Sequence, residues 1–104
     1  SDLSATTVPT QALFLMNSPF IQQQSRALAR RLLGGFSSAT ERIQHLILLA
    51  YGRPATGREV LSSMEYLLRF GELDDRHDDT ERRIDPWASL CQAVFGSNEF
   101  LFLN

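Results

Sequence analysis

The stretch from Ser38 to Pro54 reads SATERIQHLILLAYGRP and contains the start, the buried face and the end of one helix. Ser38 precedes Glu41 by three residues, the spacing of a capping box, in which each side chain accepts a hydrogen bond from a backbone N–H of the other residue. Apolar residues then recur at the three–four spacing of a single helical face, which two leucines widen: Ile43, Leu46, Ile47 and Ala50, with Leu48 and Leu49. Gly52 can adopt the left-handed conformation that ends a helix, and Pro54 prevents the helix from resuming. The stretch predicts a helix between Ser38 and Gly52, and its wide apolar surface predicts that this helix is the most buried one.

A further helix is predicted on the C-terminal side of this stretch. Thr56 and Glu59 repeat the capping-box spacing. The apolar face that follows is expected to lie toward the core and to close at Gly71; its members are Val60, Met64, Leu67 and Leu68. The turn between the two helices is short, which favours helices that pack against each other.

Two helices are predicted on the N-terminal side. Pro9 is tolerated in the first turn of a helix, so we expect a short helix over residues 8–16. Asn17 and Ser18 then offer capping oxygens directly before Pro19, an arrangement that starts a second helix. This second helix has an apolar side, and a glycine pair is expected to end it: Phe20, Ile21, Leu28 and Leu32, followed by Gly34 and Gly35.

The C-terminal part combines a charged segment with a last helix. Residues 72–85 contain seven acidic side chains and three arginines, a local charge of −4, which predicts a loop. Asp85 and Pro86 form a cap and first-turn pair for a helix whose core positions are Trp87, Leu90, Cys91 and Val94. The apolar run over residues 100–103 is expected to dock on the core or on another domain.

These patterns predict an all-α fold, a compact bundle of four to five helices with a charged loop between the last two. Residues 1–104 are expected to form a single domain, because a chain of this length with 43% hydrophobic residues can bury one core. Alternation of apolar and polar residues with a period of two, the pattern typical of strands, is absent from the sequence.

Composition argues against several classes of function. The net charge is −2 although all ten basic residues are arginine, which argues against a nucleic-acid partner. No apolar run approaches the roughly 20 residues of a membrane helix, so no membrane insertion is expected. The first seven residues lack the features of a signal peptide, and we expect an excised domain to have lost any such address. A single cysteine, Cys91, can form neither an internal disulfide nor a thiolate metal site.

Three groups of residues invite a catalytic or metal-binding interpretation, and in each case a structural interpretation is favoured. Residues 74–79 read DDRHDD and carry ligands suited to calcium or zinc, but their spacing is not that of an EF-hand, and a solvated charge run is favoured. His45 has no triad motif around it and is expected to be either a surface residue or a hydrogen-bonded core residue. Cys91 lies on a core stripe, which predicts an inert, buried thiol. We therefore predict no catalytic, cofactor or metal residue.

The arginines give the more specific predictions. Arg26, Arg30 and Arg31 fall on neighbouring turns of one helix and are candidates for binding a phosphate or an acidic partner, with an ordinary solvated face as the alternative. Arg53, next to Gly52 in a tight turn, must find acceptors for its five N–H groups. We expect it to bond helix-end carbonyls or a carboxylate, with Glu99 as the candidate partner.

Three blocks of sequence resemble one family: TVPTQALFLMNSPF over residues 7–20, AYGRPAT over 50–56 with Glu59, and WASLCQAVF over 87–95 leading into SNEF over 97–100. The family is the uncharacterised C-terminal domain of large planctomycete proteins that also carry a cytochrome-associated domain and sometimes a cytochrome c-like domain. The resemblance implies a fragment of a larger exported protein, periplasmic or in the cell envelope, whose family has no established activity. The chain departs from the family pattern at Gly96 and in the acidic loop, where we expect local variation only. It carries no Cys-x-x-Cys-His haem motif, so this piece is not expected to be the redox unit.

Three functions from different classes follow as hypotheses. The first is a non-catalytic structural or protein-interaction module that packs against the other domains of its parent protein. The second is an accessory part of a metal-dependent or redox enzyme site, which other domains complete around the acidic loop or His45. The third is a helix-turn-helix nucleic-acid binder that uses Arg58, which the charge balance disfavours. The sequence does not indicate an oligomeric state.

Overall fold

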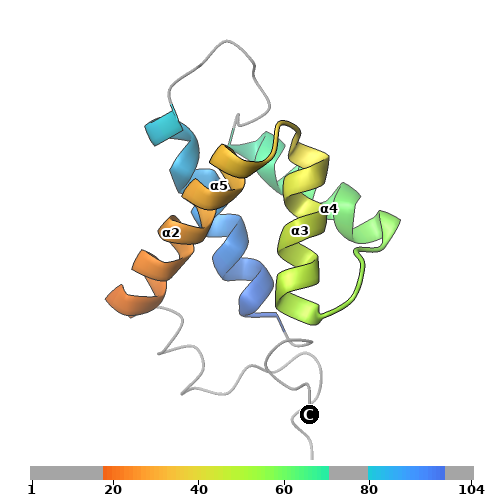
Figure 1. Cartoon of the computed structure of the whole chain (residues 1–104), viewed down its shortest axis with the longest axis horizontal. Helices are drawn as coiled ribbons and strands as arrows, with labels where there is room; N and C mark the ends of the chain where they lie inside the picture. The colour runs from red at the N-terminus through yellow and green to blue at the C-terminus, as the bar shows by residue number, and fades with distance from the viewer. Residues whose placement is uncertain (1–17, 71–79, 98–104) are drawn as a thin grey trace, which may run out of the picture.

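Four helices make up nearly all of the part of the chain that the computed structural model describes, residues 18–70 and 80–97. In chain order they are α2 (Pro19–Gly35), α3 (Ala39–Tyr51), α4 (Gly57–Arg69) and α5 (Thr80–Phe95). Those residues include no strand, and the predicted all-α, compact bundle is confirmed (Figure 1). The short helix predicted over residues 8–16 lies outside the described residues, as do residues 72–79 of the loop predicted over residues 72–85. For the rest of that loop the prediction is wrong, because residues 80–85 belong to α5.

Each of the first three described helices begins at its predicted cap. The hydroxyl of Ser18 accepts a hydrogen bond from the Ile21 N–H at 3.2 Å, and that of Ser38 accepts one from the Glu41 N–H at 3.1 Å. Thr56 and Glu59 form the complete capping box, with N–H to side-chain distances of 3.1 and 2.8 Å. These bonds satisfy donors that a helix cannot satisfy internally, which is why the polar residues fix where the helices start.

The helix ends depend on backbone conformation. Gly52 ends α3 as predicted, with φ 70° and ψ 20°, and its N–H donates to the Leu48 carbonyl at 2.9 Å. Gly34 and Gly35 differ from the prediction because both belong to α2, which ends at the extended backbone of Phe36. A left-handed glycine is therefore used only once among the described residues.

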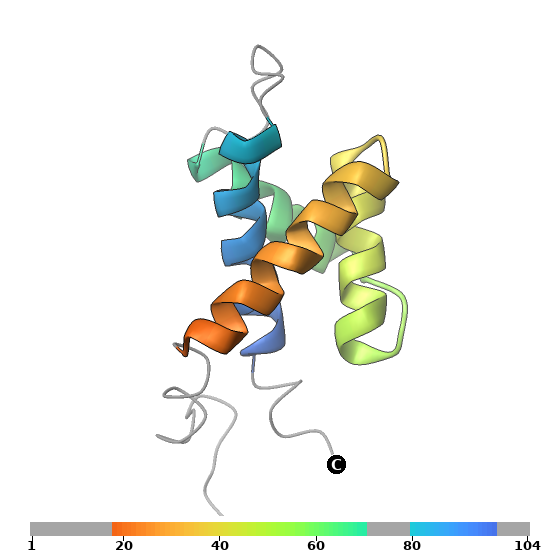
Figure 2. The same cartoon turned by 60° about the vertical axis from the view of Figure 1, so that its left-hand side comes forward.

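The core lies where α2 crosses α5, with α3 and α4 packed beside them. Helices α2 and α5 share the most extensive contact (Figures 1 and 2). The predicted core residues of α5 are all buried, and Trp87 and Cys91 have no exposed surface. The prediction that α3 is the most buried helix is wrong, because Leu48 and Leu49 are each 49% exposed whereas α5 is buried against all three other described helices.

Helix α5 begins earlier than its sequence pattern predicts. The pattern places the start at Asp85 with Pro86 in the first turn, but the helix starts at Thr80 and contains Pro86. Ile84 has no exposed surface, so burial of this side chain favours one more helical turn before the proline. Pro86 lacks the N–H that would bond the carbonyl four residues earlier, and the helix continues without that bond.

The described helices do not include one with the length and apolar composition that a membrane span requires.

Candidate functional site

The turn between α3 and α4 holds a bidentate ion pair that the sequence analysis predicted only in general form. Arg53 donates from Nη1 to Glu59 Oε1 at 2.9 Å and from Nη2 to Oε2 at 2.6 Å. It also donates to the Pro54 carbonyl at 3.0 Å, and its guanidinium lies 5.1 Å from the ring centre of Tyr51. A carboxylate does bind Arg53, and it is supplied by α4; the predicted partner Glu99 lies outside the described residues.

Glu59 therefore joins two local structures, because it caps α4 and binds the turn. The hydrogen bond from Arg53 lowers the pKa of Glu59 from 4.5 to about 2, with bonds from Thr56 acting in the same direction and partial burial opposing them. The carboxylate stays ionised at neutral pH, so it is not a candidate general acid.

A second arginine, which sequence reasoning missed, bonds the end of a helix. Arg42 of α3 is 6% exposed and donates to three carbonyls at the end of α2: those of Leu32 at 3.1 Å, Leu33 at 3.4 Å and Phe36 at 2.6 Å. Its guanidinium also lies 5.8 Å from the ring centre of Trp87. The signal was present in the spacing, since Arg42 lies one turn before Leu46 on the buried face.

The arginines of α2 do not converge on one ligand site. Arg26 forms an exposed ion pair with Asp85 of α5, which connects the two crossing helices. Arg30 and Arg31 are exposed. The guanidinium of Arg26 already binds a carboxylate, so the predicted binding of a phosphate or an acidic partner stays a prediction for Arg30 and Arg31.

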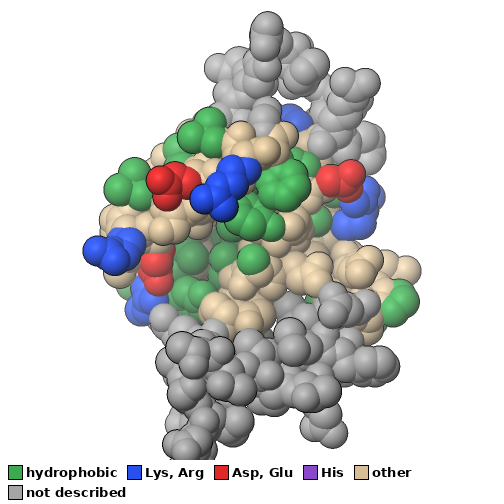
Figure 3. Space-filling view, turned by 180° about the vertical axis from the view of Figure 1, so that it is seen from behind, with side chains coloured by type: hydrophobic (Ala, Val, Ile, Leu, Met, Phe, Trp, Pro, Cys, Tyr) green, Lys and Arg blue, Asp and Glu red, His purple; other side chains and the backbone are tan. Residues whose placement is uncertain are grey.

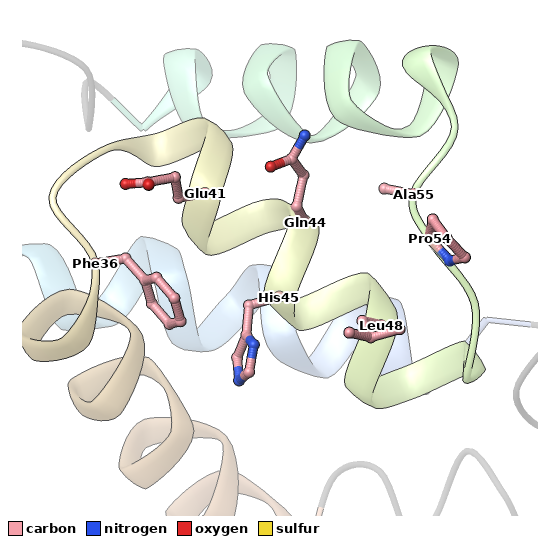
Figure 4. A pocket seen from close by; sticks show the side chains of 7 residues that line it. All are labelled: Phe36, Glu41, Gln44, His45, Leu48, Pro54 and Ala55. Atoms are coloured by element: carbon pink, nitrogen blue, oxygen red, sulfur yellow. The ribbon is translucent and has the colours of Figure 1, made fainter.

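A shallow hollow of about 350 Å³ lies on the outer side of α3 (Figure 4). His45 lies beside Phe36, with 4.8 Å between the ring centres. Figure 4 shows the side chains of Glu41 and Gln44 directed away from the imidazole. The hollow is completed by Leu48, Pro54 and Ala55. Its polar groups therefore do not meet at one point, as acid–base catalysis would require.

The other predicted candidates for reactivity or metal binding were Cys91 and the acidic run over residues 74–79. Cys91 is fully buried, as predicted, and its desolvation raises the pKa of the thiol to about 12, which disfavours the reactive thiolate. Within residues 18–70 and 80–97, no group of three or more histidine, cysteine, aspartate or glutamate side chains could hold a metal ion. The acidic run over residues 74–79, with its histidine, lies outside the described residues.

The outer face of α4 carries an exposed apolar stripe. Leu61 is 67% exposed and Leu68 is 58% exposed, and the half-buried Met64 lies between them at helical spacing. Leu68 was predicted to lie toward the core, and that prediction is wrong because Leu67 occupies the core position. Figure 3 shows hydrophobic side chains on this side of the molecule, interspersed with charged groups.

Comparison with known proteins supports membership of one family. The chain matches the family described as PSD1, a protein of unknown function (DUF1553), over residues 2–67. No curated protein and no solved structure matches it. The match includes α2, α3 and most of α4, and α5 lies beyond it. Because the match covers more than half of the 104 residues, the chain belongs to the PSD1 (DUF1553) family, a family of unknown function.

Proposed function

We propose that this chain is a non-catalytic structural or protein-interaction module of a larger exported protein, and that it packs against the other domains of that protein through the outer face of α4. The observation that carries this proposal is the exposed stripe of Leu61, Met64 and Leu68. The three residues lie at positions i, i+3 and i+7, so they form one continuous surface.

The composition of this face fits an interface. Large apolar side chains in a row on a surface indicate a binding site, whereas single exposed ones are ordinary. Charged residues flank the stripe, since Arg58, Glu65 and Arg69 are all exposed. An apolar centre with a polar rim is the usual anatomy of a protein–protein interface, in which a few central side chains supply most of the affinity.

The larger context is also part of the proposal. The resemblance of the three sequence blocks to the C-terminal domain of planctomycete cytochrome-associated proteins supports a parent protein in the periplasm or cell envelope. In this proposal the module itself binds no cofactor, and its partners are the other domains of the same parent.

The experiment that tests this proposal measures binding of the isolated chain to the separately expressed remainder of its parent protein. The double variant Leu61→Ser/Leu68→Ser should weaken binding at least ~10-fold, because it removes the apolar centre of the interface. Leu48→Ser/Leu49→Ser is the matched control, since these leucines are similarly exposed but lie on α3. Equal affinity of the α4 variant and the unmodified chain would exclude this surface.

A metal titration of the isolated chain distinguishes this proposal from the hypothesis that the chain is an accessory part of an enzyme site. Calorimetric titration of the chain with calcium or zinc should give no heat of tight binding if the module is purely structural. Tight binding of either ion would instead favour a metal site that the parent protein completes.

A further inference from the structure

A shallow groove lies where α3, α4 and α5 meet, and neither Leu61 nor Leu68 lines it (Figures 1 and 2). Its volume is about 330 Å³. On the α4 side it runs from Arg58 to Tyr66, about 12 Å along the helix axis. Such a groove favours an apolar occupant over water, because its wall is almost entirely apolar. The apolar residues that form the wall are Ile47, Tyr51, Tyr66, Leu90, Ala93 and Val94.

One polar group at the groove lacks a hydrogen bond. Ser63 lines the groove and is 7% exposed. A helical serine can donate to the carbonyl four residues earlier, but the Ser63 hydroxyl makes no hydrogen bond within residues 18–70 and 80–97. Buried hydroxyls are normally paired, because an unpaired one loses its bonds to water without replacing them. Ser63 therefore favours an occupant that brings a hydrogen-bond acceptor.

The charge at the groove is positive. Its two charged lining residues are Arg58 and Glu59. Both carboxylate oxygens of Glu59 are bound by Arg53. Arg58 is exposed and forms no ion pair with a described residue. An acidic group on the occupant would complement Arg58, since a guanidinium suits the geometry of a carboxylate.

We propose that the groove binds an extended segment of a partner polypeptide, with apolar side chains and one acidic residue. The acidic side chain pairs with Arg58, and a backbone carbonyl of the segment accepts a hydrogen bond from Ser63. An extended segment fits this role better than a helix does, because the carbonyls within a helix are already bonded.

The dimensions of the groove also favour a short extended segment. About four extended residues span its length along α4. Sites for small molecules enclose most of their ligand, which a shallow groove does not do. The groove does not depend on the function proposed for the outer face of α4, because the two surfaces have different residues.

Two short peptides test the charge at the groove. The probes are acetyl-DVIV-amide and its uncharged counterpart acetyl-NVIV-amide, each titrated into the isotopically labelled chain. At millimolar concentration both should shift the backbone amide signals of Ile47, Ser63 and Val94. The acidic probe should bind about 2–5-fold more tightly, as expected for an exposed ion pair.

Arginine variants connect that preference to one side chain. Arg58→Gln should abolish the preference for the acidic probe. Arg30→Gln is the matched control, since Arg30 is an exposed arginine of α2, and it should keep the preference. Amide signals at the groove that neither probe shifts, or a preference that survives Arg58→Gln, would overturn the proposal.

A substitution of Ser63 tests the hydrogen bond. Ser63→Ala should weaken binding of the acidic probe about 3–10-fold, because the carbonyl of the probe loses its donor. The same variant should not lower the midpoint of thermal unfolding, because the hydroxyl has no partner among the described residues. Undiminished affinity of Ser63→Ala would overturn the proposal, as would a loss of affinity that only accompanies a loss of stability.

The remaining measurements identify the occupant. Transferred nuclear Overhauser contacts should show the bound acidic probe in an extended conformation, and a helical pattern would contradict the proposal. Groove signals that shift with protein concentration alone would also contradict it, because a second copy would then be the occupant. Leu61→Ser/Leu68→Ser should bind the acidic probe as the unmodified chain does, which separates this test from that of the α4 stripe. Weaker binding by that variant would place the probe on the stripe instead.

Discussion

At the scale of single residues, two arginines hold the bundle together in different ways. Arg42 is buried and neutralises the carbonyl end of α2, where the helix dipole favours a cation. Arg53 is partly exposed and binds one carboxylate of the next helix. Both arginines use their guanidinium N–H groups in hydrogen bonds within the fold, which fits a structural role.

Replacing Arg42 with methionine should lower the free energy of unfolding by about 2–4 kcal/mol. Methionine keeps the apolar stem but leaves buried carbonyls of α2 without their charged donor, which costs more than an exposed bond does. Urea denaturation followed by circular dichroism measures the effect. Arg31→Met, at an exposed position of α2, is the control and should change stability by less than ~0.5 kcal/mol.

Arg53→Ala should lower the free energy of unfolding by about 1 kcal/mol at neutral pH, the value for a well-formed but partly exposed pair. The pKa of Glu59 is lowered in the folded state, so the stability from its ionised form is present above pH 4.5 and is lost as pH falls toward 2. The difference between Arg53→Ala and the unmodified chain should therefore shrink between pH 5 and pH 2. Denaturation at a series of pH values checks this, and a difference that does not change with pH would contradict it.

At the scale of the helices, caps and glycines determine where each element begins and ends. The three polar caps at Ser18, Ser38 and Thr56 each accept a backbone N–H three residues later. Glycine has a specific role at Gly52, whose positive φ other residues adopt only with strain. Gly34 and Gly35 are helical and have open space around the position of a side chain.

Alanine substitutions at Gly34 and Gly52 should therefore change the free energy of unfolding in opposite directions. Gly34→Ala should raise the free energy of unfolding by about 0.5–1 kcal/mol, because alanine favours the helix and restricts the unfolded chain. Gly52→Ala should lower it by about 1 kcal/mol, because a side chain is strained at φ 70°. Thermal unfolding of the two variants measures both signs, and a stabilising Gly52→Ala would refute the role given to this turn.

At the scale of the whole molecule, one core is shared by all four described helices. Trp87 is among the largest side chains of this core without exposed surface, and it lies near the guanidinium of Arg42. Tyr66 of α4 bonds Ser89 of α5 through their hydroxyls, which connects a further pair of helices. Such shared contacts predict that the bundle unfolds as one unit.

Cys91 reports on that cooperativity. Its thiol is buried and its pKa is raised to about 12, so labelling by a thiol reagent at pH 8 should be slow in the native state. In increasing urea, the labelled fraction should follow the loss of helical circular dichroism, because only unfolding exposes the sulfur. Rapid labelling without urea would show that α5 opens separately from the rest.

The chain belongs to the PSD1 family, and the apolar side chains that its bundle leaves exposed on α4 carry the proposed interface.

Local sequence patterns were sufficient to predict the helical class, the starts of α2, α3 and α4 and the end of α3. These features depend on residues three or four positions apart, such as Thr56 and Glu59, whose interactions are complete within one helical turn. The buried thiol of Cys91 was also predictable, because it lies on an apolar stripe with Trp87.

Which apolar surfaces are buried and which stay exposed depends on how the helices pack against one another. Helical periodicity reveals a stripe but not the neighbour that buries it, so the exposure of Leu48, Leu49 and Leu68 could not be predicted. Burial of Ile84 extended α5 beyond its apparent cap, and the bonds of Arg42 reach carbonyls of another helix. These outcomes depend on contacts between segments distant in sequence, and no local pattern encodes those contacts.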